Sequence, residues 1–379
     1  MNIGFDGKRA ANNLTGLGNY SRSLLAQLVQ LFDQNQYFVY TPKVSKSPRI
    51  TGFFKSLPLN LKLPLRNSIK LMWRSFGIKK QLVQDHIDLF HGLSQEIPVG
   101  LAPLKIKSVV TIHDLIYLRF PEYYNAVDRY IYNRKSEYAC KNSDRIVAIS
   151  ERSKKDIIEF YGVPADKIEV IYQSCDESFK KIYPQDIREK VLAQYDLPAK
   201  YILNVGTIEP RKNLLLLIKA LPHIDATYKL VVVGKQKAYA KLVKAEIAHL
   251  KLEDRVIFLE NIPFQDLPVI YQLSSLFVYP SLYEGFGIPI IEALYGNVPV
   301  IAATGSCLEE AGGAASIYIA PDNAEALTFQ VNKVLADPAL QQHMKAEGLK
   351  YVQQFDDQLL AKKMMDCYLN TLNGKFASC

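Results

Sequence analysis

The chain has 379 residues, of which 49% are hydrophobic and 22% are charged, and its formal net charge is +8. This length exceeds one ordinary domain and favours two. No apolar run reaches the roughly 18 residues that a membrane span needs, so no segment is expected to cross a bilayer.

The cysteines are scattered and odd in number, and none of them has the Cys-x-x-Cys spacing of a metal or redox site. The chain opens with a strand-like run instead of a secretory signal. Both features fit a protein of the reducing cytoplasm. The five cysteines are Cys140, Cys175, Cys307, Cys367 and Cys379.

Apolar β-branched runs alternate with helical patterns in both halves, which predicts an α/β protein with parallel sheets covered by helices on both faces. The expected strands are 2–5, 37–40, 88–91, 108–112, 145–148 and 167–171, then 201–205, 229–233, 255–259, 276–279, 298–302 and 316–319. The expected helices are 20–32, 152–161, 214–221, 237–250, 264–272 and 358–372.

This alternation predicts two Rossmann-like domains, 1–180 and 186–357, followed by a terminal segment, 358–379, that carries an amphipathic helix. The linker between the domains is expected between Gln173 and Asp186.

A glycine pair follows the first expected strand, where Gly16 and Gly18 precede a helix. Glycine lets a ligand approach the backbone closely at such a helix start. A third glycine is missing, so the dinucleotide fingerprint is not met. An ordinary turn is the alternative interpretation.

The segment 43–84 carries ten Lys or Arg residues and no Asp or Glu. Its cations alternate with apolar residues that include Trp73, a pattern typical of a surface that contacts an anionic bilayer. A solvated basic face is the alternative. Nucleic acid is not expected as a partner, because no helix-turn-helix, zinc or RNA-binding motif accompanies the charge.

Three strand ends of the first half carry polar candidates: His91, His113 and Ser150. In open α/β sheets, ligands bind beyond the carboxyl ends of the strands. His113 is the strongest candidate, because an imidazole can bind a substrate hydroxyl or steer a proton. Ser150 is at least as well suited to capping the next helix. His91 and Ser150 are therefore weak candidates for contacts with an acceptor or substrate.

In the second half, the expected strand 201–205 ends in Gly206, and the loop that follows carries Arg211 and Lys212 just before a helix. Cations are disfavoured at a helix N-terminus, so their placement there indicates a bound polyanion. Arginine grips phosphate oxygens with two hydrogen bonds, and lysine acts as a point charge. A solvated basic loop is the alternative.

The expected strand 276–279 leads into a second glycine loop, in which Glu284 and Glu292 are separated by seven residues. Gly285, Phe286 and Gly287 follow the first glutamate, and Pro289 suits the start of the next helix. The helix N-terminus would face an anionic ligand such as a diphosphate. A helix cap with two solvated glutamates is the alternative.

Both loops resemble the signatures of the retaining glycosyltransferases of family 4. The resemblance implies a GT-B fold, in which two Rossmann-like domains face an interdomain cleft and the C-terminal helix crosses back to the first domain. It places Arg211, Lys212, Gly206, Gly285, Phe286 and Gly287 on the donor diphosphate side, together with Gly16 and Gly18. It places Glu284 and His113 at the transferred sugar and Glu292 at the nucleotide ribose.

The implied reaction transfers a sugar from a nucleoside diphosphate sugar to a hydroxyl of a glycan or lipid-linked glycan. The motifs look most like those of bacterial mannosyltransferases of polysaccharide assembly, which favours GDP-mannose. The chain contains no Asp-x-Asp motif, so neither a metal nor a cofactor is expected. The alternatives are a UDP-sugar-dependent enzyme, an epimerase or hydrolase on the same fold, and a non-catalytic sugar-nucleotide-binding subunit.

Overall fold

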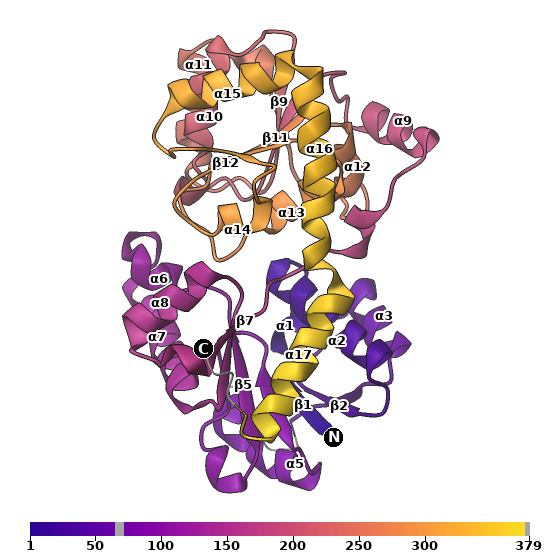
Figure 1. Ribbon diagram of the computed structural model, residues 1–379, viewed down its shortest axis with the longest axis vertical. Helices are drawn as coiled ribbons and strands as arrows, with labels where there is room; N and C mark the ends of the chain where they lie inside the picture. The colour runs from indigo at the N-terminus through magenta and orange to yellow at the C-terminus, as the bar shows by residue number, and fades with distance from the viewer. Residues whose placement is uncertain (65–71, 376–379) are drawn as a thin grey trace. The chain divides into compact units, whose positions relative to one another are not determined.

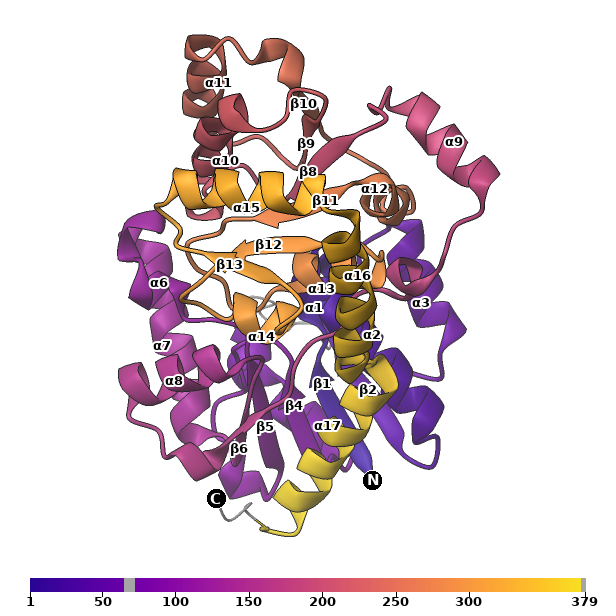
Figure 2. The same ribbon diagram turned by 45° about the horizontal axis from the view of Figure 1, so that its top comes forward.

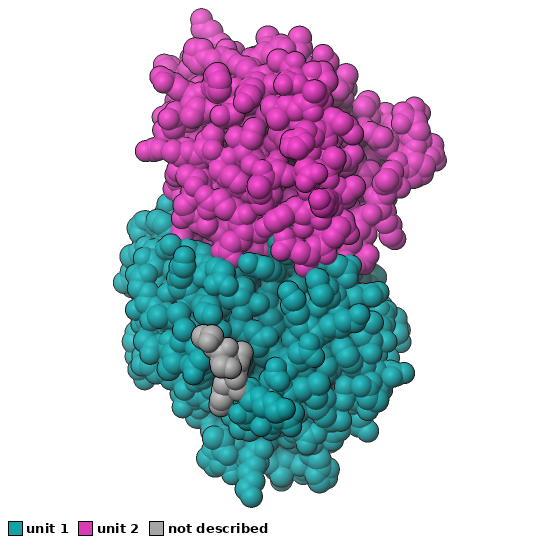
Figure 3. Space-filling model, in the orientation of Figure 1, with its two compact units in different colours: residues 1–174, 355–379 teal, residues 175–354 magenta. Residues whose placement is uncertain are grey.

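The computed structural model describes residues 1–64 and 72–375 (Figure 1). The chain divides into two compact units, which Figure 3 colours separately: unit 1 comprises Met1–Ser174 and Phe355–Cys379, and unit 2 comprises Cys175–Gln354. The chain thus passes into unit 2 within the expected linker and returns to unit 1 three residues before the expected terminal segment.

The described part of unit 1 contains a parallel sheet of seven strands in the order β3-β2-β1-β4-β5-β6-β7. The strands are β1 (Asn2–Asp6), β2 (Gln36–Tyr40), β3 (Asn60–Lys62), β4 (Leu89–Gly92), β5 (Lys107–Ile112), β6 (Arg145–Ala148) and β7 (Ile168–Val170). The α-helices are α1 (Lys8–Asn12), α2 (Gly16–Leu31), α3 (Pro48–Ser56), α5 (Lys79–Gln84), α6 (Ile116–Arg119), α7 (Ala126–Asn142), α8 (Glu151–Tyr161) and α17 (Asp357–Leu372).

Alternate residues of these strands enter two different cores, as the period of two in a strand requires. Phe5, Val39 and Val109 pack with apolar residues of α2 and α17. Phe90 and Val110 pack on the other face with residues of α5, α7 and α8. Burial on both faces explains why the strands have almost continuous apolar sequences. α17 packs against α2, so the last helix completes the cover of the first sheet (Figures 1 and 2).

The described part of unit 2 contains a parallel sheet of six strands in the order β10-β9-β8-β11-β12-β13. The strands are β8 (Tyr201–Val205), β9 (Lys229–Val233), β10 (Val256–Leu259), β11 (Leu276–Tyr279), β12 (Val300–Ala303) and β13 (Ile317–Ile319). The α-helices are α9 (Gln185–Gln194), α10 (Leu214–Ala220), α11 (Ala240–His249), α12 (Leu267–Leu273), α13 (Ile288–Tyr295), α14 (Leu308–Gly312), α15 (Ala324–Ala336) and α16 (Pro338–Val352).

The prediction of two parallel α/β sheets is confirmed, and each of the twelve expected strands has a counterpart in the structure. The sequence analysis missed β3, whose residues Asn60–Lys62 are mostly exposed at the sheet edge and lack an apolar run. It also missed α7, which buries small residues such as Ala139 and exposes Val127 and Tyr130, so its sequence is not amphipathic in the usual sense.

Tyr368 of α17 tests how strongly this last helix stabilises unit 1. Its hydroxyl lies 2.6 Å from Nδ1 of His91, and both side chains are fully buried. The change Tyr368→Phe should lower the free energy of unfolding by about 1–3 kcal/mol, because the imidazole nitrogen is left without a partner.

Equilibrium urea denaturation measures this difference. The control is Leu369→Ala on the same helix, where the side chain is 40% exposed and the change should cost about 0.5 kcal/mol or less. Equal losses for the two variants would contradict a specific role for the Tyr368 hydroxyl.

Candidate functional site

The two glycine loops of unit 2 follow neighbouring strands. β8 pairs in parallel with β11, with Leu276 opposite Ile202 and Phe277 opposite Leu203. β8 and β11 also mark the point at which the strand order reverses, because β9 and β10 lie on one side and β12 and β13 on the other. Ligands of open α/β sheets bind outside the carboxyl ends of the strands at such a switch point.

Gly206 leaves β8 with a φ of +150°, a conformation that suits glycine. The neighbouring Gly234 at the end of β9 is equally constrained, since an added Cβ would lie 1.9 Å from the carbonyl oxygen of Gly206. The chain then forms a 3-10 turn, Pro210–Lys212, before α10. Asn213 donates hydrogen bonds to the carbonyl oxygens of Pro280 and Pro321, which fixes this turn to the loops after β11 and β13.

Glu284 lies between the two cations that the sequence analysis assigned to a diphosphate. Its Oε2 is 2.7 Å from Nη1 of Arg211, and its Oε1 is 2.6 Å from Nζ of Lys212. The hydroxyl of Tyr279 accepts a hydrogen bond from Lys212 at 2.6 Å and donates one to Glu284 at 3.0 Å. The structure therefore joins predicted residues from both loops in one network.

Arg211 also binds a second carboxylate, Glu209, through Nη2 at 3.0 Å, and Lys237 lies 2.6 Å from the other oxygen of that carboxylate. Arg211 and Lys212 are thus paired with Glu209 and Glu284 within unit 2. The solvated-loop alternative is wrong, since the side chains of Arg211 and Lys212 are only 15% and 16% exposed.

The network keeps Glu284 ionised. Burial alone would raise the pKa of its carboxyl group, but the charges of Lys212 and Arg211 outweigh burial and lower the pKa to about 2. Glu284 raises the pKa of Arg211 in return, although burial opposes this. A carboxylate held in this way accepts hydrogen bonds and carries a permanent negative charge.

Glu292 has the opposite electrostatic environment. It lies on α13, and its Oε2 accepts a hydrogen bond from the hydroxyl of Tyr271 at 2.8 Å. Burial raises the pKa of Glu292 to about 8, and the nearby Asp176 adds to the increase. Glu284 and Glu292 thus belong to different networks, with different protonation states at neutral pH. This separation does not favour the paired carboxylates of a glycosidase.

Most of the residues between the two glutamates are buried, and Ile288 and Pro289 are partly exposed. Gly287 is the N-cap of α13, and an added Cβ would lie 2.6 Å from Cβ of Ala311. Gly287 is therefore required for packing. From the sequence, Gly287 was instead expected to lie beside the donor diphosphate. Phe286 is 6% exposed and belongs to the core. Gly285 is buried between Glu284 and Phe286.

The first glycine pair is part of a helix. α2 begins at Gly16, so Gly18 lies in its first turn. An added Cβ at Gly18 would come within 1.9 Å of the carbonyl oxygen of Asn13, whereas one at Gly16 would meet no atom within 4 Å. The expected loop is wrong, but Gly16 still leaves open space at the start of a 16-residue helix.

His113 follows β5 and is 4% exposed. Its Nε2 lies 2.9 Å from the carbonyl oxygen of Leu93, and its Nδ1 lies 2.8 Å from Nε2 of Gln173. Burial lowers the pKa of His113 to about 4, so the ring is neutral at physiological pH. With both nitrogens engaged, the expected proton-steering role receives no support from this geometry.

The two weak candidates have local partners. His91 is fully buried, with Nδ1 facing the hydroxyl of Tyr368 and Nε2 lying 2.8 Å from Oγ1 of Thr111. Ser150 is fully buried and caps α8 by accepting a hydrogen bond from the Ser153 amide at 3.0 Å. This geometry gives no support to the expectation that the two residues contact a substrate, and the capping interpretation of Ser150 is confirmed.

The basic segment 43–84 also differs from its expected form. Trp73 is 2% exposed, and its indole nitrogen donates to Gln81 at 2.8 Å. Arg74 pairs with Asp6 and with Glu96, the latter at 3.3 Å, and Lys62 pairs with Asp85 at 2.6 Å. Trp73 therefore cannot anchor a bilayer contact. Arg66 and Lys70 lie outside the described residues.

Three residues of the unit 2 network were not predicted: Glu209, Lys237 and Tyr279. Glu209 lies in the same loop as Arg211, so its charge next to two cations was the available signal. Tyr279 ends β11 and resembles a core residue in the sequence. Only the structure shows that its hydroxyl reaches the network.

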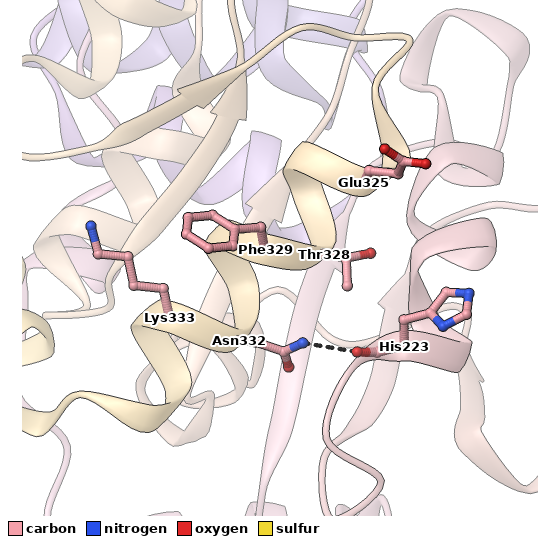
Figure 4. A pocket seen from close by; sticks show the side chains of 6 residues that line it. All are labelled: His223, Glu325, Thr328, Phe329, Asn332 and Lys333. Carbon is pink, nitrogen blue, oxygen red and sulfur yellow. Dashed lines mark hydrogen bonds between the residues drawn. The ribbon is translucent and has the colours of Figure 1, made fainter.

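A surface depression elsewhere in unit 2 contains none of the predicted residues. Its lining comes from α15 and from the 3-10 turn Leu221–His223, and Asn332 donates a hydrogen bond of 2.8 Å to the carbonyl oxygen of His223 (Figure 4). Among residues 1–64 and 72–375, no group of three or more His, Cys, Asp or Glu side chains could hold a metal ion. None of the helices in these ranges is long and apolar enough to cross a membrane.

Comparisons with known proteins identify the same class of enzyme that the two glycine loops of unit 2 resemble. The family model of group 1 glycosyl transferases matches residues 188–351, and the model of glycosyltransferase family 4 matches residues 14–179. The O-antigen chain mannosyltransferase B of Escherichia coli is 28% identical over 380 residues, which cover 94% of this chain and 96% of that protein. A serotype-specific mannosyltransferase of the same species, WbdA, is 28% identical over 70% of this chain and 34% of its own length.

Solved structures share the fold. Anabaena HepE, crystallised with UDP and glucose, has a TM-score of 0.76 and 20% identity, and the match covers 98% of this chain and all of that one. WaaG, a glycosyltransferase of lipopolysaccharide biosynthesis, has a TM-score of 0.71 and 17% identity, with 97% and 99% covered. The fold and the paired motifs define a GT-B glycosyltransferase. The chain belongs to glycosyltransferase family 4 and is an enzyme of that class.

Glu292 generates a pH-dependent prediction. Its pKa is about 8 in the folded protein against an ordinary value of 4.5, so between these values the folded state binds more protons than the unfolded state. Stability therefore falls as the pH rises through this window. The variant Glu292→Gln should lack this contribution, so its stability relative to the wild type should increase from pH 5 to pH 8.

Urea denaturation at pH 5, 6.5 and 8 measures the difference. Glu347→Gln on α16, where the side chain is exposed, is the control and should show no such trend. A constant difference between Glu292→Gln and the wild type would contradict a buried neutral carboxyl group.

Proposed function

We propose that this glycosyltransferase transfers mannose from GDP-mannose to a hydroxyl of a glycan or lipid-linked glycan, with retention of the anomeric configuration. The observation that carries the proposal is the network of Glu284, Arg211 and Lys212 at the switch point of unit 2. The preference for mannose is supported by relatives that are named as mannosyltransferases, one of which matches almost the whole chain.

The chemistry requires stabilisation of a departing nucleoside diphosphate. Arg211 and Lys212 offer fixed N–H donors, and preorganised donors lower the barrier because they need not reorient during the reaction. The ionised Glu284 would face the positive charge that develops at the sugar. The neutral carboxyl group of Glu292 would bind the nucleotide ribose. In this scheme the cations take the place of a metal ion, and no cofactor is required.

A second donor class is favoured by a specific observation, because HepE, a structural neighbour, was crystallised with UDP-glucose. The deciding experiment compares GDP-mannose, UDP-glucose and UDP-galactose, with and without EDTA, by following release of the nucleoside diphosphate. GDP-mannose should be turned over at least ten times faster, and EDTA should have no effect. Turnover of a UDP-sugar alone would overturn the donor assignment, and loss of activity in EDTA would overturn the metal-independent scheme.

Lys212 provides the prediction for the site itself. Lys212→Ala removes a charge-assisted hydrogen bond worth about 1.5–3 kcal/mol, which corresponds to a loss of donor turnover of at least about tenfold. Glu284 keeps its partner Arg211 in this variant, so the protein should still fold.

Steady-state kinetics with varied donor and a thermal unfolding curve check both statements. The matched control is Lys219→Ala, an exposed lysine on α10 of the same unit, which should leave turnover unchanged. Activity of Lys212→Ala within twofold of the wild type would remove Lys212 from the diphosphate site.

A further inference from the structure

The first sheet has a switch point of its own, at which the predicted candidate His91 is buried in β4. β1 lies between β2 and β4, so the strand order reverses between β1 and β4. Asp6 ends β1, and Glu96 lies in the loop after β4. Arg74 joins these two carboxylates in one ion-pair network. The carboxyl edge of unit 1 is therefore organised at the place where α/β sheets bind ligands.

Two further cations follow Asp6 after a single glycine. Lys8 and Arg9 are partly exposed on α1 and form no ion pair with the other residues of 1–64 and 72–375. The amide of Lys8 donates to Oδ1 of Asp6 at 3.1 Å, which fixes the start of α1 against the switch point. Burial is the main cause that lowers the pKa of Lys8, and the charges of Arg74 and Arg9 lower it further against the opposing effect of Glu96 and Asp6.

The loop after β2 adds to this charge. Nδ2 of Asn12 donates to the carbonyl oxygen of Lys43 at 2.9 Å and to that of Lys8 at 3.2 Å. The amide of Ser45 donates to the carbonyl oxygen of Ala11 at 2.9 Å. These bonds hold the exposed Lys43 beside α1, which itself packs against α2 and α3 (Figure 1). The backbones of two cation-bearing segments, one after β1 and one after β2, are thus held together.

The negative charge at this edge is smaller than the positive charge. Asp6 and Glu96 face Arg74, and Glu96 also pairs with Lys135 at 3.1 Å. Lys8, Arg9 and Lys43 then remain in excess. The partial burial of Lys8 and Arg9 is unfavourable without an anion. In unit 2, by contrast, the cations Arg211 and Lys212 are matched by Glu209 and Glu284.

The loop after β4 is held in an unusual conformation. Gln95 has a φ of +60°, which non-glycine residues adopt rarely. Its side chain donates to the carbonyl oxygen of Asp114 at 2.8 Å, and its amide donates to that of Thr111 at 2.9 Å. The loops after β4 and β5 are therefore joined. Strained residues of this kind cluster at binding sites.

We propose that the switch point of unit 1 binds a phosphate or diphosphate group of the acceptor through Lys8 and Arg9, with Lys43 at its rim. Arginine matches phosphate oxygens with its planar fork, and lysine adds a mobile point charge. The identity of the ligand as the acceptor rests on the proposed function. A lipid-linked diphosphate and a free phosphorylated sugar share this chemistry, and the experiment separates them.

The test measures binding to the full chain that has been saturated with GDP, so that the donor site is occupied. The probes are geranyl diphosphate, inorganic pyrophosphate and geraniol, titrated by calorimetry at low and high salt. The double variant Lys8→Ala/Arg9→Ala is compared with Lys362→Ala/Lys363→Ala, which removes two exposed adjacent lysines from α17 of the same unit. Thermal unfolding curves check that both variants are folded.

The wild type should bind geranyl diphosphate in a salt-sensitive manner and should not bind geraniol. The variant of Lys8 and Arg9 should lose at least tenfold in affinity, and the α17 variant should match the wild type. Arg9→Lys should retain part of the binding. Equal binding of pyrophosphate and geranyl diphosphate would identify the phosphate alone as the ligand, and tighter binding of the latter would identify a lipid-linked one.

The proposal is overturned if the wild type binds neither anion, or if the Lys8 and Arg9 variant binds them as the wild type does. Equal losses of affinity in the two double variants would overturn the proposal as well, because a general effect of removing two positive charges would then explain the result. The donor affinity and the turnover of GDP-mannose are measured separately on the same preparations. A failure of the proposed donor would therefore appear in those values and leave the result for the anion site intact.

Discussion

The ion pair between Glu284 and the cations Arg211 and Lys212 is the interaction on which the arrangement of unit 2 depends. A buried carboxylate is costly without partners, and removing one partner of a buried pair typically costs about 3–5 kcal/mol. Arg211 and Lys212 come from the loop after β8, and Glu284 comes from the loop after β11. Satisfying the charge therefore requires both loops to adopt one geometry. The hydroxyl of Tyr279 bridges Lys212 and Glu284, so the ammonium group has little freedom before a ligand arrives.

The two sheets use the same topology with different charge balances. Each reverses its strand order at one pair of strands, and in each an arginine spans two carboxylates at that point: Arg211 in unit 2 and Arg74 in unit 1. In unit 2 the carboxylates nearly neutralise the cations, so a diphosphate would have to compete with Glu284 and Glu209 for the same donors. In unit 1, Lys8 and Arg9 remain in excess. An anion there would add to the network without displacing a carboxylate, which favours a ligand that binds independently of the donor.

The local sequence predicted helices and strands well where their burial leaves a clear pattern of apolar residues. β6, β8, β9 and β11 have the expected bounds, because strands covered on both faces are continuous apolar runs. The site residues were harder to predict, because a polar residue at a strand end can face either a ligand or the core. His91 is bound by Tyr368, 277 positions away in the sequence, and no local pattern carries that information. The same limit applies to Trp73, whose partner Gln81 becomes visible only when the segment is folded.

Glu284 and Glu292 show how one residue type acquires two chemical characters within a single motif. Glu284 is buried and Glu292 is partly buried, and burial raises the pKa of each carboxyl group, but only Glu284 has cations within hydrogen-bonding distance. Glu284 is therefore an obligate acceptor with a fixed charge. Glu292, with a hydroxyl donor and no paired cation among the described residues, is neutral below about pH 8 and can both donate and accept. A ribose diol also donates and accepts, so the protonated form of Glu292 matches it without burying a charge, whereas an ionised Glu284 suits a centre that becomes positive.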